Sequence, residues 1–362
     1  SFIEGIISHI DEMLTSQVNE IIHHADFQKL EGSWRGLEHL VFNSETDDML
    51  RIEVMSITKK EIGGVFKEYK GEKWDRSPLF RKVYEEEFGM PGGKPYGVLI
   101  GDYDFDHSPN DVKLLRGVGQ IAAAAHCPFI SAAKPSLLNL KSWQDLVKPP
   151  KIDTVLSKTD PTYADWRSLR ASEDSRYIGL TLPRFLSRLP YDPEKNPIDE
   201  FVFTEDTAGE DHERFAWSNA AYAFGANLTR SFKLTGWCTC IRGRENGGTV
   251  EGLPVHVFKS DDGTVDMKCP TEIGITDRRE HELAKVGLAP LSHYKNENFA
   301  VFMGAQSLQE PKKYYEDDAT ANANLSARMT YLFACCRFAH YLKVMVRDKV
   351  GSFMERAEME EW

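Results

Sequence analysis

The sequence predicts a mixed α/β protein in which a core of short strands and helices lies between long helices at the two ends of the chain. The segments 1–48 and 321–362 repeat apolar residues every three or four positions, which is the period of an amphipathic helix. Between them, residues 49–320 carry short apolar runs separated by helical patterns, as in a βαβ layer. Because 362 residues is long for one hydrophobic core, we expect two subdomains within residues 49–320.

Residues 1–48 predict a helical arm with two apolar stripes. The first stripe consists of Ile3, Ile6, Ile7, Ile10, Met13, Leu14, Val18, Ile21 and Ile22. The second follows Asp26, a residue type that commonly caps helices, and consists of Phe27, Leu30, Trp34 and Leu37. Stripes of this kind are normally buried, either on the core of the same chain or on a second chain. The sequence leaves both possibilities open.

Residues 49–320 change their periodicity many times. Residues 50–54 alternate apolar and charged side chains and predict a strand. Two short strands around a turn are expected within 249–267. The other predicted elements are strands at 96–103, 128–132, 177–182 and 299–303, and helices at 59–69, 79–88, 110–125, 183–189, 215–228 and 280–286. Strand, helix and strand in this order favour a layered α/β core.

The segment 321–362 predicts one long helix over residues 323–349, which would extend to about 40 Å if it were continuous. Its end is acidic. The acidic residues are Glu355, Glu358, Glu360 and Glu361. Since the pattern is still helical at Trp362, we expect the natural protein to continue beyond this residue.

Composition excludes several classes of function. A net charge of −12 disfavours nucleic acid as a partner, because a phosphate backbone favours lysine and arginine. The charge suits a protein that meets a basic surface, and equally an ordinary solvated acidic surface. No run approaches the roughly 20 apolar residues that span a bilayer, so we expect a cytoplasmic protein without direct membrane insertion. The six cysteines show no disulfide or metal-binding spacing, which is typical of reduced thiols.

Two patterns suggest chemistry but are better explained by structure. Gly117 and Gly119 outline a GxGxxA dinucleotide fingerprint, yet the residues before them are already helical, which favours close helix packing. Asp102, Asp104 and Asp106 alternate as metal-binding carboxylates can, but no glycine stands at the turn position of a calcium loop. No GxSxG, HExxH or GxxxxGK[ST] motif occurs. We therefore expect no catalytic residues, no cofactor and no metal.

The densest charge in the chain is an arginine-rich cluster. It consists of Arg242, Arg244, Glu245, Asp277, Arg278, Arg279 and Glu280. The cluster lacks a base in a recognisable catalytic arrangement. Planar guanidinium groups pair directionally with carboxylates, so the cluster suits ion pairs between subunits. An ion-pair network within one chain explains it equally well.

Several long segments resemble the large subunit of the bacterial type VI secretion contractile sheath, the TssC/VipB family. They are residues 27–40 (FQKLEGSWRGLEHL), 96–105 (YGVLIGDYDF), 122–130 (AAAAHCPFI), 177–191 (YIGLTLPRFLSRLPY), 217–248 (which begins WSNAAYAFGANLTRSF), 269–280 (CPTEIGITDRRE) and 338–351 (FAHYLKVMVRDKVG). They are spread over nearly the whole chain. Matches of this length are more specific than any short motif.

The resemblance implies a structural protein with the fold of a contractile tail sheath. Such a subunit pairs with a small sheath subunit, and the heterodimers stack around an inner tube on a baseplate. Contraction propels the tube, and an AAA+ ATPase recycles the contracted sheath. The resemblance places the stripe Phe27, Leu30, Trp34 and Leu37 in an arm that contacts other subunits. It places Glu355, Glu358, Glu360 and Glu361 where sheath proteins face the inner tube.

The sequence departs from the family pattern at its C-terminal end. The family completes a sheet between neighbouring subunits with a C-terminal strand, and the sequence ends before such a strand.

The alternative function, from another class, is a cytoplasmic α/β enzyme that binds an anionic substrate through the arginine-rich cluster. An enzyme would show a concave pocket with converging polar groups, whereas an assembly subunit would show exposed apolar arms.

Overall fold

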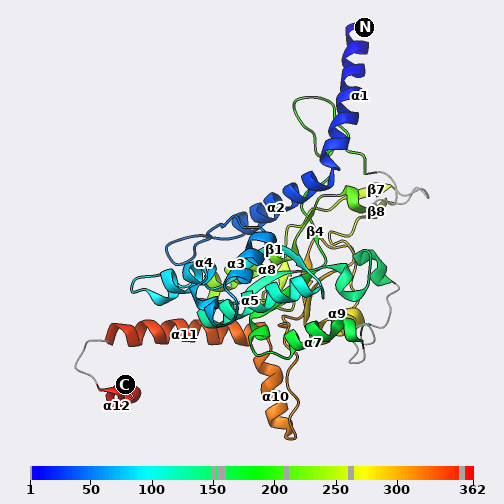
Figure 1. Ribbon diagram of the computed structural model, residues 1–362. Coiled ribbons are helices and arrows are strands. Elements are labelled where there is room, and N and C mark those ends of the chain that lie inside the picture. The colour runs from blue at the N-terminus through cyan, green and yellow to red at the C-terminus, as the bar shows by residue number, and fades with distance from the viewer. Residues whose placement is uncertain are drawn as a thin grey trace.

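The computed structural model describes residues 2–147, 152, 156, 160–207, 212–259, 265–349 and 355–362. A central body carries helices that extend from it at both ends of the chain (Figure 1). The predicted α/β class, with long N- and C-terminal helices, is confirmed. The expected division of residues 49–320 into two subdomains remains a prediction.

The body is built on a six-stranded sheet with the order β1-β2-β3-β9-β10-β6. Four neighbouring strands are parallel, and the last two are antiparallel. Their bounds are β1 Leu99–Phe105, β2 Phe129–Ala133, β3 Ile178–Leu182, β9 Leu288–His293, β10 Ala300–Phe302 and β6 Thr249–Val250. Every residue of β2 and β3 is buried, as expected for parallel strands covered on both faces.

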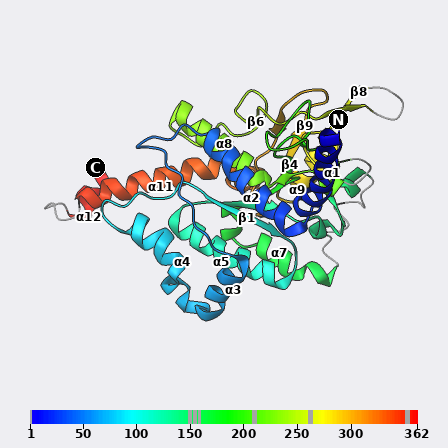
Figure 2. The same ribbon diagram turned by 90° about the horizontal axis from the view of Figure 1, so that it is seen from above.

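Helices cover both faces of this sheet (Figure 2). Helix α8, Ala220–Thr235, lies on one face, and α5, Pro109–Ala125, lies on the other. The neighbouring residues Phe129 and Ile130 of β2 belong to different hydrophobic clusters, because successive side chains of a strand point to opposite faces. Helix α7, Ala164–Arg170, and helix α3, Lys59–Glu68, pack around α5.

The N-terminal segment forms two helices, as predicted. Helix α1 is Phe2–Ile22 and helix α2 is Ala25–Phe42. Helix α2 lies along α8, whereas α1 projects away from the body (Figure 1). The strand predicted at 50–54 does not form, because no neighbouring strand pairs with this extended segment among the described residues.

The single helix predicted over 323–349 is wrong. The chain forms α10, Asp317–Ser326, and α11, Met329–Lys349, which point in different directions (Figure 1). Between them, the Met329 amide donates to the Ala305 carbonyl at 2.9 Å, and the Ser307 amide donates to the Ala327 carbonyl at 3.1 Å. These tertiary bonds fasten the junction to the body. Helix α12, Arg356–Glu361, follows residues 350–354, which lie outside the described part.

Smaller elements complete the body. Residues 183–189 were expected to be helical but contain strand β4, Phe185–Leu186, which pairs with β5, Trp217–Ser218. The remaining helices and strands are α4 Pro78–Phe80, the π-helix η2 Arg81–Gly89, β7 Val257–Lys259, β8 Val265–Met267 and α9 Asp277–Lys285. The 3₁₀ turns are η1 Gly71–Arg76, η3 Pro135–Leu138, η4 Trp143–Val147, η5 Pro161–Tyr163, η6 Asp174–Tyr177 and η7 His212–Arg214.

Candidate assembly surfaces and the hollow beside the sheet

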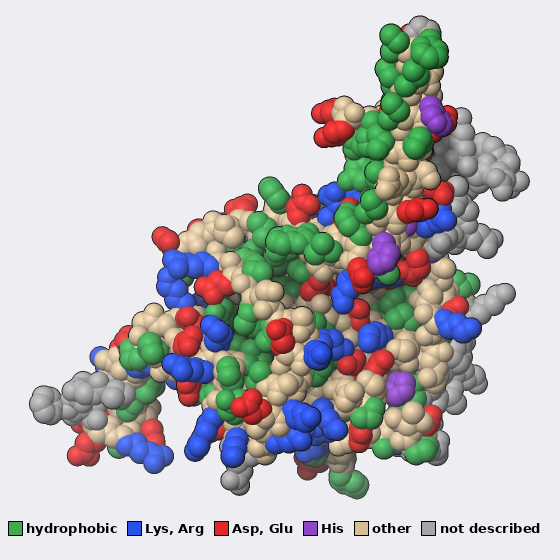
Figure 3. All heavy atoms as spheres, turned by 45° about the horizontal axis from the view of Figure 1, so that its top comes forward, with side chains coloured by type: hydrophobic (Ala, Val, Ile, Leu, Met, Phe, Trp, Pro, Cys, Tyr) green, Lys and Arg blue, Asp and Glu red, His purple; other side chains and the backbone are tan. Residues whose placement is uncertain are grey.

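Helix α1 exposes its apolar stripe to solvent. Phe2 is 85%, Ile3 68% and Met13 62% exposed, and Ile22 is the buried residue of the helix. The space-filling view shows green side chains along this projecting helix (Figure 3). The last turns contact the body through polar groups: Asn19 donates to the Thr204 carbonyl at 3.1 Å. A helix with such a stripe is stable only when another surface covers it.

Helix α2 packs on the body through a face opposite to its predicted stripe. Gly32, Gly36 and Leu40 are buried, whereas Phe27, Leu30 and Trp34 are exposed and Leu37 is half-buried. A β-carbon at position 32 would overlap the Trp217 carbonyl, and one at position 36 would overlap the Tyr222 ring. Glycine therefore allows the helix backbone to approach this closely. The two glycines, four positions apart, were the sequence signal for this buried face.

A network of buried charges fastens α2 to the body. Arg188 binds Glu31 of α2 at 2.5 Å and Glu205 at 2.6 Å, and Arg35 binds Glu31 at 3.0 Å. The side chains of Arg188 and Glu205 are 7% and 1% exposed. Burial alone would raise the pKa of Glu31, but the hydrogen bonds and charges of Arg188 and Arg35 outweigh it and lower the pKa. Sequence reasoning missed this network, because its members are distant in the sequence.

Helix α11 divides into a buried and an exposed face. Met329, Leu332 and Phe333 pack into the body. Further along the helix, apolar side chains are exposed: Phe338, Tyr341, Leu342, Val344, Met345 and Val346. The predicted tube-facing residues Glu355, Glu358, Glu360 and Glu361 are all exposed. Within this end, Arg356 pairs with Glu360 at 2.8 Å, and Glu355 and Glu358 form a capping box.

The structure separates the arginine-rich cluster into two groups. On α9, Arg278 and Arg279 pair with Glu282 of the same helix, at 3.0 and 2.5 Å. Asp277 is exposed at the start of this helix. Arg242, Arg244 and Glu245 lie in an exposed loop, where Arg244 lies 5.3 Å from the centre of the Phe299 ring. Among the described residues, no ion pair joins the two groups.

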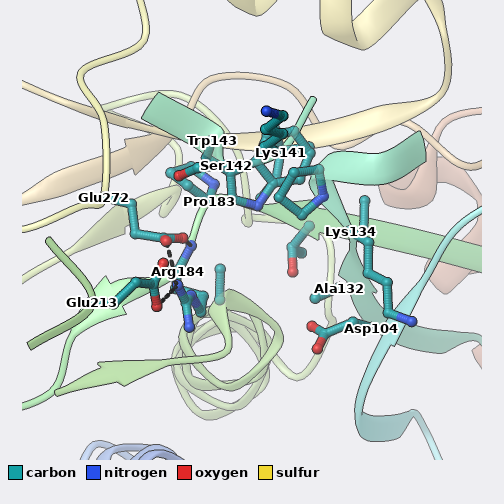
Figure 4. Close-up of a pocket in the computed structure, with 15 residues that line it drawn as sticks. Asp104, Ala132, Lys134, Lys141, Ser142, Trp143, Pro183, Arg184, Glu213 and Glu272 are labelled. Carbon is teal, nitrogen blue, oxygen red and sulfur yellow. Dashed lines mark hydrogen bonds and ion pairs between the residues drawn. The ribbon is translucent and has the colours of Figure 1, made fainter. Parts of the chain in front are cut away.

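A hollow of about 220 Å³ lies at the carboxyl ends of β1, β2 and β3 (Figure 4). In α/β sheets this is the usual place for ligands. Arg184 is held there between Glu272, at 2.6 Å, and Glu213, at 3.1 Å. Burial raises the pKa of Glu272, although Arg184 opposes the shift. Because the arginine is already neutralised, it offers little to an anionic ligand.

The remaining polar groups of the hollow do not form a catalytic set. Asp104 faces the hollow from the end of β1, with Lys134 beside it (Figure 4). Burial raises the pKa of Asp104, and the charge of Arg184 opposes this rise. The volume is below the roughly 300–1,000 Å³ of typical ligand sites. The arginine-rich cluster lines neither this hollow nor a second one beside Glu173 and Lys312.

The chain is similar to known proteins over nearly its whole length. In the described part, no helix is both long and apolar enough to span a bilayer. Residues 4–309 match the family model VipB, described as EvpB/VC_A0108, tail sheath N-terminal domain. Residues 318–362 match VipB_2, described as EvpB/VC_A0108, tail sheath gpW/gp25-like domain. A similar relative is the type VI secretion system sheath protein TssC1 of Pseudomonas aeruginosa, with 60% identity over 360 residues, which cover 99% of this chain and 72% of the relative.

These matches confirm the resemblance that the sequence segments carry. One family model spans most of the body, including all six strands of the sheet and both N-terminal helices except the first residues of α1. The second spans the C-terminal helices. The chain therefore belongs to the family of type VI secretion system sheath proteins.

Proposed function

We propose that this chain is the large subunit of a type VI secretion contractile sheath in the bacterial cytoplasm. In this role it pairs with a small sheath subunit, and the heterodimers polymerise around an inner tube from a baseplate. Contraction propels the tube, and an AAA+ ATPase recycles the contracted sheath. The protein acts through its surfaces and turns over no substrate.

The observation that carries this proposal is helix α1. Its first turns extend from the body with an uncovered apolar stripe, and the stripe of α2 formed by Phe27, Leu30 and Trp34 is also exposed. Contiguous apolar surface of this kind is typical of protein–protein interfaces. The small subunit and neighbouring heterodimers are the partners that we assign to this arm.

Co-expression with a small sheath subunit tests the proposal. We expect a stable 1:1 complex, and hollow tubules in negative-stain micrographs. The double variant Ile6→Asp with Ile10→Asp should lose the complex, because two charges interrupt the apolar stripe. The control, Ser8→Asp with Ser16→Asp, adds the same charges to the polar face of α1 and should retain it. A chain that remains monomeric beside the small subunit would contradict the proposal.

We also propose that the acidic end contacts basic residues of the inner tube. The four glutamates are exposed on or beside α12, and carboxylates attract a basic surface over about a Debye length. They are Glu355, Glu358, Glu360 and Glu361. Reversing all four to lysine should weaken tube co-sedimentation and leave the heterodimer intact. Reversing the three exposed acids Glu316, Asp317 and Asp318 at the start of α10 is the control for added positive charge, and equal losses in both variants would refute a specific contact.

The arginine-rich cluster fits this function as a set of inter-subunit ion pairs. Arg242, Arg244 and Glu245 are exposed on a loop, and Asp277 and Arg278 are exposed on α9, so both groups are available to neighbouring subunits. The enzyme alternative finds no specific support in this geometry. Its proposed anion-binding residues line neither hollow, and the one arginine that lines the sheet-edge hollow is paired with two carboxylates.

A further inference from the structure

The outer face of α11 carries an apolar stripe that is exposed to solvent. Its members follow one another at intervals of four and three positions, the spacing that aligns side chains along one side of a helix. They are Tyr331, Cys335, Phe338, Leu342 and Met345. The residues that fasten α11 to the body, which include Leu332, Phe333 and Cys336, lie on the opposite side of the helix. The stripe is therefore available to another surface.

The end of α8 enlarges this apolar surface. The indole ring of Trp237, which follows α8, lies 5.0 Å from the ring of Phe338 and 6.1 Å from the ring of Tyr341, measured between ring centres. Leu234, in the last turn of α8, is also exposed. Large aromatic side chains are common anchors of protein interfaces. We call the stripe of α11, together with Tyr341 and Trp237, the α11 patch.

Helix α1 carries a second uncovered stripe with the same spacing. It consists of the exposed residues Ile3, Ile7, Ile10 and Leu14, at intervals of four, three and four positions. Two helices with this spacing can interdigitate their side chains as knobs into holes. Both helices have 21 residues and are about 30 Å long, so they can contact each other over several turns.

The apolar face of α1 is wider than one such stripe. Ile6 and Met13 lie beside the stripe and are exposed as well. A contact between two helices uses a narrow seam, whereas a wider face can meet two partners. The arm can therefore bind a second copy of the chain along its stripe and a small subunit beside it.

The charges of the two helices are of opposite sign. Helix α1 contains four acidic residues and neither lysine nor arginine, whereas α11 contains four basic residues and one acidic residue. Lys343 of α11 binds the Tyr84 hydroxyl at 3.3 Å, and Arg347 binds the Phe88 carbonyl at 2.6 Å. Because these partners are neutral, both positive charges remain. Opposite charges attract α1 to α11, whereas two acidic α1 helices repel each other.

Helices α1 and α11 project from different sides of the body in both ribbon views (Figure 1, Figure 2). A contact between them therefore joins two copies and uses a different surface on each copy. We propose that the α1 stripe of one copy docks on the α11 patch of the next copy. A head-to-tail contact of this kind produces an open helical polymer when the rotation between copies does not close a ring. It would join neighbouring subunits of the proposed sheath, so its role there rests on that function.

Sedimentation of the purified chain over a range of concentrations tests the contact. The unmodified chain should form species larger than a dimer as its concentration rises. The variants Ile7→Asp and Leu342→Asp each place a charge in one stripe and should weaken association at least about tenfold, because burying an unpaired charge is unfavourable. Ile7 and Leu342 are exposed, so neither change disturbs the core. The matched controls Ser8→Asp and Val344→Asp place the same charge away from the stripes and should associate normally.

A mixture of the two variants distinguishes a head-to-tail contact from other arrangements. The Ile7→Asp copy retains its α11 patch and the Leu342→Asp copy retains its α1 stripe, so the mixture should form a 1:1 pair that grows no further. Weakening by Ile7→Asp alone would mean that α1 pairs with α1, and weakening by Leu342→Asp alone that α11 pairs with α11. Either result contradicts the proposal, as does an unmodified chain that remains monomeric at every concentration.

Co-expression with a small sheath subunit separates this contact from the proposed function. A chain that forms the heterodimer but does not associate with itself would retain the function and overturn the contact between α1 and α11. Loss of the heterodimer in Leu342→Asp, without self-association of the unmodified chain, would assign the α11 patch to the small subunit instead.

Discussion

Helices α1 and α2 have similar sequence patterns and opposite relations to the body. Both carry an apolar stripe at helical spacing, and in both the stripe is largely exposed. Helix α2 nevertheless lies firmly on α8, because glycines at positions 32 and 36 allow close approach and Arg188 binds Glu31. Helix α1 has polar contacts at Thr15 and Asn19 and a buried Ile22, and the turns before Thr15 extend into solvent (Figure 1).

This difference shows that an apolar stripe does not identify the surface that buries it. For α2, the face that contacts the body is made of small residues and one leucine, Leu40, while the large side chains point outward. A stripe left uncovered by its own chain is then available for a partner. The three predictions that follow test whether α2 is fastened and α1 is free.

Removing the buried arginine should have the largest effect. The variant Arg188→Met leaves the buried Glu205 carboxylate without its arginine, with the Tyr191 amide and His23 still beside it, which costs about 3–5 kcal/mol of the free energy of unfolding. The control Arg278→Met breaks an exposed pair on α9 and should cost about 0.5 kcal/mol or less. Urea unfolding of both variants provides the comparison. If the two variants lose equal stability, the network does not fasten α2.

Adding one methyl group to each helix in turn should show the difference between α2 and α1 more directly. Gly32→Ala places a β-carbon against the Trp217 carbonyl, a backbone atom that cannot rotate away, at a cost of about 1–3 kcal/mol. Gly5→Ala in α1 meets nothing within 4 Å and should stabilise that helix by up to about 1 kcal/mol. Hydrogen exchange of the α2 amides should become faster only in the first variant. Unchanged exchange in Gly32→Ala would show that α2 is not closely packed.

A third expected effect is a dependence on pH. His39 of α2 lies 5.0 Å from the centre of the Phe185 ring, and burial lowers its pKa from 6.5 to about 4. The unfolded chain binds the proton first, so stability is full above pH 6.5 and falls as the pH decreases from 6.5 through 4. His39→Gln should flatten this part of the curve of unfolding free energy against pH. His9→Gln, on the exposed α1, should leave the curve unchanged.

Local sequence patterns predicted most elements of the fold and fewer of their contacts. The buried strands β2 and β3 and the helices α5 and α8 were identifiable because runs of apolar and small residues are local signals. Residues 50–54 alternate as a strand does, but a strand requires a partner, which periodicity cannot supply. The break between α10 and α11 has no glycine or proline and depends on bonds from Ala305 and Ser307, far from it in sequence.

Some of the candidate surfaces were predicted and others were not, because sequence patterns are local and do not show which distant residues come together. The stripe of Phe27, Leu30 and Trp34 and the acidic end were identifiable from sequence pattern, but whether the stripe is exposed was left open by the sequence, and the partners of both stay predictions. The arginine-rich cluster was predicted as one group because its charged residues are concentrated in two short segments. In the structure the two segments do not pair, and Arg278 and Arg279 bind Glu282 on their own helix.

The two residues His23 and His24 separate α1 from α2. Since α1 has 21 residues, it is about 30 Å long. By simple trigonometry, a tilt of about 10° at this joint moves the tip of α1 by about 5 Å, which is the length of one helical turn. Because the joint is fixed to the body, a small rotation there would move a partner bound at the tip sideways by about that distance.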